Sequence, residues 1–167
     1  MSVRRDAAPA DAPLDARARL ALFHGTTVLA EEAVRIPDVD LTFEKLVRSG
    51  CTSLTINAAG LRPLKLKDMG CKEPSELRRL GFDALHLVNE SYCAELCAAF
   101  GAQAVTDAFV VEPADAVAVA GTAAVDTLNL SVETLLQLCA GSSTEAAAVI
   151  AQTPGGVLDT VSASTLL

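Results

Sequence analysis

The sequence predicts an all-α repeat protein built from short helices. Its glycines recur at steps of ten or eleven residues and later at steps of twenty. Seven lie on this ladder: Gly50, Gly60, Gly70, Gly81, Gly101, Gly121 and Gly141. A fixed period is typical of repeat proteins, in which each unit covers the apolar face of the next. Apolar residues between the later glycines are spaced by three and four, which indicates one-sided helices.

The chain divides into three predicted segments. Residues 1–13 interleave Ala, Pro and Asp and predict a disordered N-terminal arm. Residues 14–39 predict a helical N-terminal cap, in which two short helical patterns flank Gly25. Residues 40–167 predict the repeat region, so that the 167 residues hold one folded domain behind a short arm.

The first units share a local pattern around each glycine. An aliphatic residue lies four positions earlier, as Leu46 does before Gly50, and the next residue is apolar or Cys, as Cys51 is. Glycine in this position is the usual residue after a helix, because the left-handed backbone costs it little. Pro63 and Pro74 follow shortly after two of the glycines, where proline suits the first turn of the next helix. Each unit therefore predicts one short helix that a glycine ends.

After Gly81 the units lengthen to about twenty residues, and each predicts a pair of short helices. Two one-sided stripes mark them: Cys93, Leu96, Cys97 and Phe100, and then Val132, Leu135, Leu136 and Cys139. Pro113 is expected to begin another helix. Helices this short are unstable alone, because helix nucleation is costly. They must be held by their neighbours, as a solenoid requires.

Residues 40–141 resemble right-handed solenoids of the leucine-rich type and their all-helical variants. The resemblance implies a right-handed solenoid of short helices in units of 10–11 and 20 residues. A β/α alternative remains open, since Leu64–Leu66 and Leu85–Leu87 look like the strand core of a leucine-rich repeat. In those two units the family's asparagine position is occupied by Met69 and Glu90, which favours the helical units.

Charge is distributed unevenly along the chain. All thirteen basic residues lie between Arg4 and Arg79, and residues 80–167 carry ten acids and no base. A surface without bases repels nucleic acid, which needs its phosphates neutralised, and attracts a basic partner. The alternative is an acidic face that keeps an Ala-rich array in solution. A basic stripe is also present, and we expect it to be solvated or paired with acids of neighbouring units: Arg62, Lys65, Lys67, Lys72, Arg78 and Arg79.

Membrane insertion and secretion are not expected. The longest mostly apolar stretch, residues 116–125, is about half of the ~20 residues that a membrane span needs. The N-terminus lacks the apolar core of a signal peptide. Five cysteines is an odd number, which disfavours a full set of disulfides and favours a reducing, cytoplasmic location.

No residues predict catalysis, a cofactor or a metal site. Cys93 and Cys97 have the spacing of two metal ligands on one helix face, and His86 precedes them by seven residues. A fourth ligand is missing, and both cysteines lie on the apolar stripe, so we expect them to pack in the core. His86 is expected at the rim, and no phosphate-binding motif is present.

These observations predict a non-catalytic scaffold for protein–protein contacts, a structural subunit of a larger assembly. Asp107, Glu112 and Asp115 are the candidate contacts for a basic partner. The apolar C-terminal end is expected to be covered by a partner or by a second copy, through four residues: Val157, Leu158, Leu166 and Leu167. The alternative is a self-associating structural protein. A third, less favoured hypothesis is a small Cys/His metal protein or enzyme.

Overall fold

The computed structural model describes Gly25 and residues 42–153, and every regular element in 42–153 is a helix. In chain order these elements are α2 (Phe43–Arg48), α3 (Ser53–Ala58), α4 (Pro63–Asp68), η1 (Pro74–Leu80), η2 (Ala84–Val88), α5 (Glu90–Phe100), α6 (Ala102–Phe109), α7 (Pro113–Val119), α8 (Ala124–Thr127), α9 (Val132–Leu138) and α10 (Ser143–Gln152). Elements η1 and η2 are 3₁₀ helices. The predicted arm, most of the predicted cap and the apolar C-terminal residues lie outside the described part.

A backbone reversal ends each of the early helices. After α2, the Gly50 N–H donates to the carbonyl of Val47 at 3.0 Å, and the Cys51 N–H donates to the carbonyl of Leu46 at 3.1 Å. Gly50 has a φ of 77°, in the left-handed region. This pair of bonds is the Schellman motif, which brings the residue after glycine against the residue four before it. Both side chains are buried here, so Leu46 and Cys51 are the two buried apolar residues that flank this helix end.

The same stop recurs after α3, α4 and η1, with glycine at the left-handed position each time. After α8 an asparagine takes this role. Asn129 has a φ of 56°, and the Leu130 N–H donates to the carbonyl of Val125 at 2.8 Å. Asparagine tolerates this conformation better than most residues. Asn129 therefore provides a reversal between Gly121 and Gly141 that the glycine spacing alone does not reveal.

Helix starts follow the predicted signals in most units. Pro63, Pro74 and Pro113 occupy the first turns of α4, η1 and α7. Thr42 and Thr52 accept hydrogen bonds from the third residue of α2 and α3, respectively. Such caps satisfy backbone N–H groups that have no partner within the helix.

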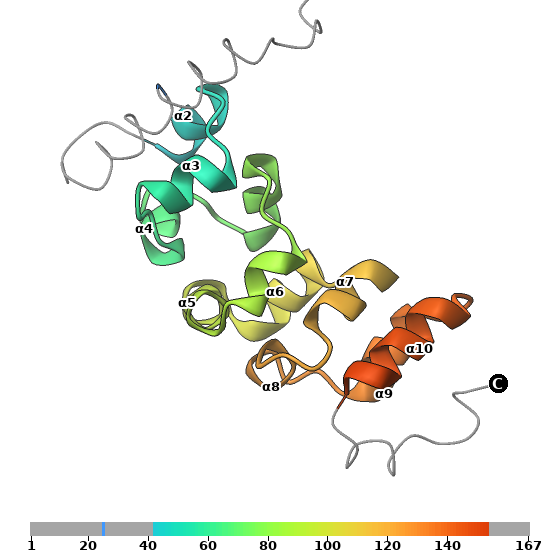
Figure 1. Cartoon of the computed structure of the whole chain (residues 1–167). Coiled ribbons are helices and arrows are strands. Elements are labelled where there is room, and N and C mark those ends of the chain that lie inside the picture. The colour runs from blue at the N-terminus through green and yellow to red at the C-terminus, as the bar shows by residue number, and fades with distance from the viewer. Residues whose placement is uncertain (1–24, 26–41, 154–167) are drawn as a thin grey trace, which may run out of the picture.

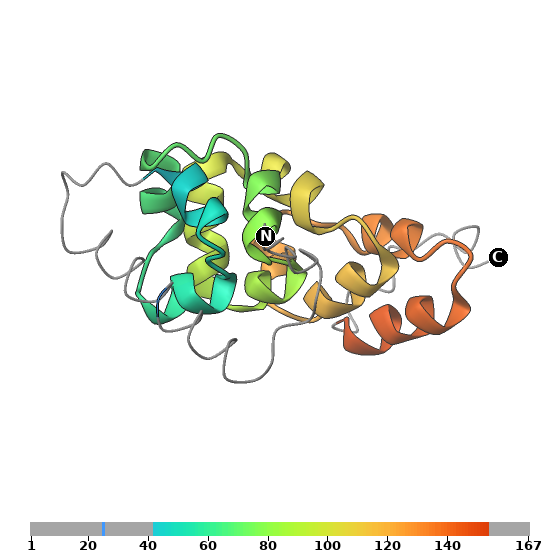
Figure 2. The same ribbon diagram turned by 90° about the horizontal axis from the view of Figure 1, so that it is seen from above.

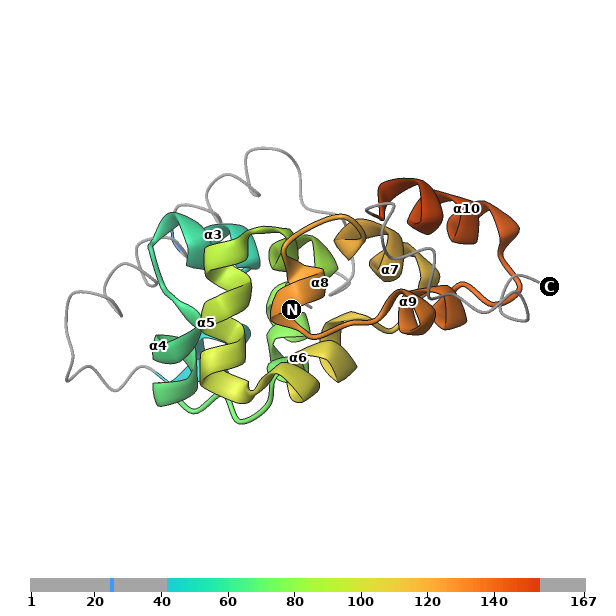
Figure 3. The ribbon, with the colours of Figure 1, turned by 90° about the horizontal axis from the view of Figure 1, so that it is seen from below.

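The described elements form an elongated body with α2 near one end and α10 near the other (Figure 1). The elongated outline is kept after rotation by 90° (Figure 2). Elements three places apart in chain order lie in contact: α4 with α5, η1 with α6, η2 with α7, α5 with α8, and α7 with α10. Figure 3 shows α5 between α4 and α8.

We name three columns of elements from these contacts. Column A holds η2, α7 and α10, and α3 is added to it because α3 and η2 line one cavity; column B holds α4, α5 and α8; column C holds α2, η1 and α6. Helix α9 contacts α7 and α10 of column A. The buried side chains of all columns form one continuous apolar cluster along the body. Each short helix of a column is thus held by its neighbours in that column, and α9 is held by α7 and α10.

The structure confirms the all-α prediction and excludes strands from the described residues. Leu64–Leu66 lies in α4 and Leu85–Leu87 lies in η2, so the β/α alternative is wrong for these segments. Each segment begins two residues after a helix N-cap residue. Its first leucine, Leu64 or Leu85, is exposed to solvent and does not face a neighbouring strand. The stripes of Cys93 and Val132 fall on α5 and α9, as predicted.

Among the described helices, none is both long enough and apolar enough to cross a bilayer.

Two glycines with nearly the same φ, 74° at Gly60 and 72° at Gly121, test how much backbone conformation and packing each contribute to stability. A Cβ at Gly60 would meet no atom within 4 Å, whereas a Cβ at Gly121 would lie 2.3 Å from the carbonyl oxygen of Gln152 in α10. We expect Gly60→Ala to lower the free energy of unfolding by about 1 kcal/mol through backbone strain. Gly121→Ala adds overpacking to the same strain and should cost about 3 kcal/mol. Urea unfolding of the two variants measures the difference, and equal losses would contradict the close approach of α10 to Gly121.

Candidate interaction surface

Arg62, the N-cap residue of α4, joins this helix to α5. Its Nε donates to the two carboxylate oxygens of Glu95, at 3.0 and 2.9 Å. Its Nη2 donates to the Oγ of Ser91 at 3.3 Å, and the guanidinium lies 5.0 Å from the centre of the Tyr92 ring. The hydrogen bond with Glu95 raises the pKa of Arg62 further, so the group stays charged. This arginine therefore fastens α5 to the preceding element of column B.

Two further cations bind the C-terminal ends of helices three places along the chain. The Nζ of Lys67 in α4 donates to the carbonyl of Ala99 in α5. The Nη1 of Arg78 in η1 donates to the carbonyl of Ala108 in α6 at 3.1 Å. The last carbonyls of a helix have no partner within it and carry the negative end of the helix dipole. Lys67 and Arg78 each satisfy one of these carbonyls in the next element of their own column.

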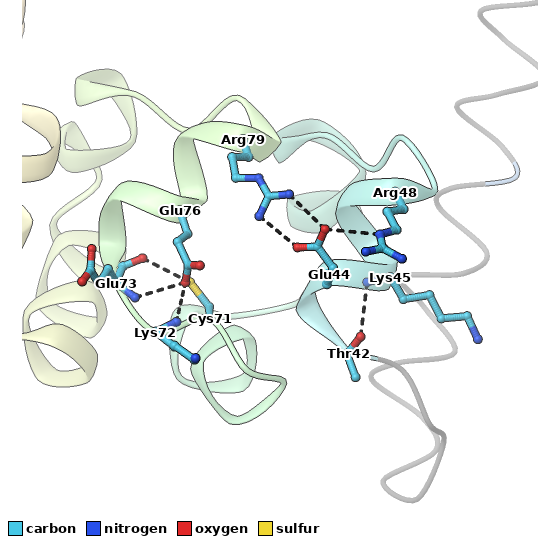
Figure 4. A network of polar contacts seen from close by, with 9 residues as sticks. All are labelled: Thr42, Glu44, Lys45, Arg48, Cys71, Lys72, Glu73, Glu76 and Arg79. Atoms are coloured by element: carbon cyan, nitrogen blue, oxygen red, sulfur yellow. Dashed lines mark hydrogen bonds and ion pairs between the residues drawn. The ribbon is translucent and has the colours of Figure 1, made fainter.

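Glu44 connects α2 to η1 at the N-terminal end of the described body (Figure 4). Its carboxylate accepts from Nη1 and Nη2 of Arg79, at 2.9 and 3.1 Å, and from Nε of Arg48 at 3.3 Å. The hydrogen bonds from Arg79, followed by those from Arg48, lower the pKa of Glu44 below its ordinary value. An exposed pair of this kind contributes little alone, but it fixes the two elements in register.

A second carboxylate in Figure 4 caps the start of η1. The N–H groups of Lys72 and Glu73 donate to Oε2 of Glu76, at 2.6 and 3.3 Å. The Cys71 thiol donates to the carbonyl of Glu73 at 3.3 Å. These contacts are local and organise the link between α4 and η1.

The predicted basic stripe therefore has mainly a structural role. Arg62 and Arg79 pair with acids of neighbouring elements, as one of the two expectations stated. Lys67 and Arg78 bind backbone carbonyls instead of acids, which the sequence pattern did not indicate.

Acids of the C-terminal half lie mostly at helix starts. Asp83 and Glu112 are the N-cap residues of η2 and α7. Five more lie in the first turns of α5, α7, α8, α9 and α10, respectively: Glu90, Asp115, Asp126, Glu133 and Glu145. Carboxylates at these positions stabilise the positive end of the helix dipole. No helix from α5 to α10 has a base of its own in its last turn, so Lys67 and Arg78 supply cations at the ends of α5 and α6 from preceding elements.

The three predicted contact acids lie along one short stretch but do different things. Asp107 in α6 accepts from the Nε2 of Gln103 at 2.8 Å and lines a cavity of about 310 Å³ between α6 and η1, together with Glu73. Asp115 accepts from the N–H groups of Val111 and Glu112, at 3.1 and 3.0 Å. It is a helix cap, so its carboxylate is already committed to α7.

The structure reveals an apolar surface that sequence reasoning did not identify. Leu54 in α3 is 70% exposed and Leu85 in η2 is 67% exposed. A cavity of about 360 Å³ lies where these two elements meet the starts of α4 and α5. Its lining is mixed: Asn57, Gly60, Leu61, Arg62, Leu85, His86, Asn89 and Tyr92. The sequence signal that could have identified these two leucines is their position in the repeat, because Leu54 and Leu85 fall outside the positions that the repeat buries.

Aromatic rings surround the inner side of this cavity. Tyr92 is only 5% exposed, stacks on Phe82 with ring centres 5.8 Å apart, and has a hydroxyl without a hydrogen-bond partner. Burial raises the pKa of Tyr92, so the hydroxyl stays protonated. His86 lies 4.7 Å from Phe82, between ring centres, and its Nδ1 lies 2.9 Å from Oδ1 of Asp83. His86 is half-buried at the edge of the cavity, where it was expected as a rim residue.

The cysteines are placed for packing. Cys51, Cys71, Cys93 and Cys139 are buried, and Cys97 is half-buried. Burial raises the pKa of the Cys71 and Cys93 thiols to about 12. A thiol with such a pKa is a poor nucleophile and a poor metal ligand at neutral pH. Within residues 42–153, no three side chains of His, Cys, Asp or Glu gather as metal ligands.

Removing Arg79 should change how Glu44 titrates. Because the pKa of Glu44 is lowered in the folded chain, its pairing stabilises the fold above the unfolded pKa of about 4.5. That contribution is lost as pH falls through the lower folded pKa. We expect Arg79→Gln to raise the pKa of Glu44, and Arg48→Gln to raise it less, in carboxylate NMR titrations. An unchanged pKa in Arg79→Gln would contradict the pairing.

Thiol labelling should separate core cysteines from reactive ones. In the native chain at pH 7 we expect slow reaction of Cys71 and Cys93 with a disulfide reagent, because little thiolate is present. Cys97 should react first, since it is more exposed. All five should react rapidly after unfolding in urea. Rapid native labelling of Cys93 would support the Cys/His hypothesis instead.

Comparisons of the chain with protein-family models, with curated proteins and with solved structures found no match in any of the three. The resemblance to leucine-rich-type solenoids therefore stays a prediction from the repeat pattern. What the surface can do follows from its own chemistry: several bases are bound within the chain, acids lie at helix starts, and the exposed Leu85 lines a cavity.

Proposed function

We propose that this chain is a non-catalytic α-solenoid that serves as a scaffold for protein–protein contacts, as a structural subunit of a larger assembly. One observation carries the proposal: contacts recur between elements three places apart along most of the described chain. Side-chain hydrogen bonds between these elements join residues 29 to 35 positions apart. Similar separations along the chain are expected of a solenoid with three short elements per turn.

The surface supports a contact role. A solenoid presents a long face relative to its mass, and such faces bind other macromolecules. Four bases of the predicted basic stripe, Arg62, Lys67, Arg78 and Arg79, are bound to other parts of the chain, and the C-terminal half adds acids at helix starts. The proposed partner is therefore a protein with a basic surface, and a nucleic acid is not proposed.

Self-association is the alternative, favoured by the apolar residues near the C-terminus of the sequence. Changing Leu166 and Leu167 to Asp should then turn a homo-oligomer into a monomer, measured by analytical ultracentrifugation. The Cys/His hypothesis predicts bound metal, which elemental analysis of the purified chain measures.

The scaffold proposal predicts a stoichiometric complex at native expression levels. Affinity purification with crosslinking, followed by sizing, should recover the chain in a larger assembly with crosslinks to a basic partner. Recovery as a lone monomer would overturn both interaction proposals.

For the acidic contacts, Asp107→Asn is the better variant, because neutralising Asp115 removes a helix cap. Glu133→Gln on α9 is the control, since it also removes one negative charge from the C-terminal half.

A further inference from the structure

We infer that the groove between α3 and η2 binds a basic, amphipathic segment of the partner protein, with one large apolar side chain inserted in the cavity. The inference rests on the proposed scaffold function and names the surface and the chemistry of its partner. We call this site the α3–η2 groove and define it by the cavity-lining residues Asn57, Leu61, Leu85, His86 and Tyr92. The exposed Leu54 and Val88 lie on the same two elements and do not line the cavity itself.

Register places the exposed apolar residues on the two walls of this groove. Leu54 and Leu85 are each the second residue of their element, in neighbouring elements of column A. Asn57, which lines the cavity, lies three residues after Leu54 on the same face of α3. Val88 lies three residues after Leu85, and such residues eclipse in a 3₁₀ helix. Val88 is 43% exposed, so an apolar strip flanks the cavity on its η2 side.

The cavity between these walls has a buried apolar lining at its inner side. Leu61 and Tyr92 are 1% and 5% exposed, and both line it. Its volume of about 360 Å³ is at the small end of ligand sites, which suits one side chain and not a large cofactor. A leucine or phenylalanine of the partner would remove Leu54 and Leu85 from water while it filled this space.

Two polar groups near the cavity have unused hydrogen-bonding capacity, one of them buried. The Tyr92 hydroxyl has no partner, although buried polar groups are normally satisfied. The Asn89 side chain uses its Oδ1 for the Tyr92 N–H at 3.0 Å, which leaves its amide NH₂ for a ligand carbonyl. Backbone groups of a bound segment are the complement to such groups. These positions favour a peptide over a purely apolar ligand.

Charge around the groove favours a cationic segment. Arg62 is the base that lines the cavity, and it is held by both carboxylate oxygens of Glu95 and by Ser91. Asp83 and Glu90, at the starts of η2 and α5, are both exposed. Beyond residue 79 the chain has no Lys or Arg to balance them. Lysines or arginines flanking the inserted side chain would pair with these acids.

Binding of defined peptides to the full chain tests the inference. The probe is a synthetic amphipathic peptide of Leu, Phe and Lys, and its twin carries Glu in place of every Lys. We expect the Lys peptide to bind in fluorescence anisotropy, the Glu twin to bind at least about tenfold more weakly, and added salt to weaken the Lys peptide. Equal binding of the two peptides, or no binding of either, would overturn the inference.

Variants locate the binding. Leu54→Ser with Leu85→Ser should weaken the Lys peptide by about tenfold or more, with little effect on folding because both side chains are exposed. Leu64→Ser is the matched control. Leu64 is also the second residue of its helix and is 49% exposed, but it lies on α4 of column B. Equal losses in the control and the double variant would show that binding is not at the groove.

Tyr92→Phe tests the hydroxyl separately. We expect it to weaken peptide binding severalfold while the unfolding temperature stays the same or rises, because an unsatisfied buried hydroxyl is removed. A purely structural tyrosine would change the unfolding temperature and leave binding intact, which would overturn the role of the hydroxyl.

The native complex separates this inference from the scaffold proposal. If the Leu54→Ser, Leu85→Ser chain still recovers the same stoichiometric assembly, the groove assignment fails and the scaffold function stands. If that chain loses the partner while Leu64→Ser keeps it, the groove is the contact. If the unaltered chain recovers no partner and binds no peptide, both proposals fail.

Discussion

The left-handed residue that follows α2, α3, α4, η1 and α8 is the constraint on which the structure depends. After α2, Gly50 reverses the backbone so that Cys51 packs beside Leu46, and the next helix begins two residues later. Repeated at intervals of about ten residues, this stop keeps α2, α3 and α4 at six residues each. Helices of that length do not persist in water, because nucleation costs more than a single turn returns. The fold therefore depends on contacts between elements, and the buried cluster that runs along all three columns supplies them.

Electrostatic contacts also stabilise the fold, and they differ between the N-terminal and C-terminal halves of the chain. In the N-terminal half, cations near helix ends reach the next element of their column, as Lys67 does at the carbonyl of Ala99 and Arg78 at the carbonyl of Ala108. The helices of the C-terminal half carry acids at their starts and no Lys or Arg of their own in their last turns. Local helix chemistry thus accounts for much of the charge asymmetry in the sequence, and the remaining negative potential is what the proposed partner would meet.

The sequence predicts the units of this fold much better than their arrangement. Glycine steps, the apolar residue four before each glycine and the prolines after it all have direct causes in the helix stop and the helix start. Asn129 escaped this reasoning because asparagine replaces glycine where the left-handed conformation is needed. The contact between elements three places apart also could not be read, since the spacing of ten and twenty residues contains no sign of a longer period. The groove was missed for the same reason: Asn57 of α3 and Leu85 of η2 line one cavity only through tertiary packing, and an exposed leucine such as Leu85 is ordinary by itself.

A period of three elements has a consequence for how such a chain can change in length during evolution. Insertion or loss of one unit would move every later element to the next column, so that residues built for one face would arrive on another. Arg62 would then stand opposite the wrong helix instead of Glu95, and Gly121 would no longer receive the end of α10. Duplication of three consecutive units would preserve all of these relationships. We therefore expect related arrays of different length to differ by whole sets of three elements, with the faces of the columns preserved.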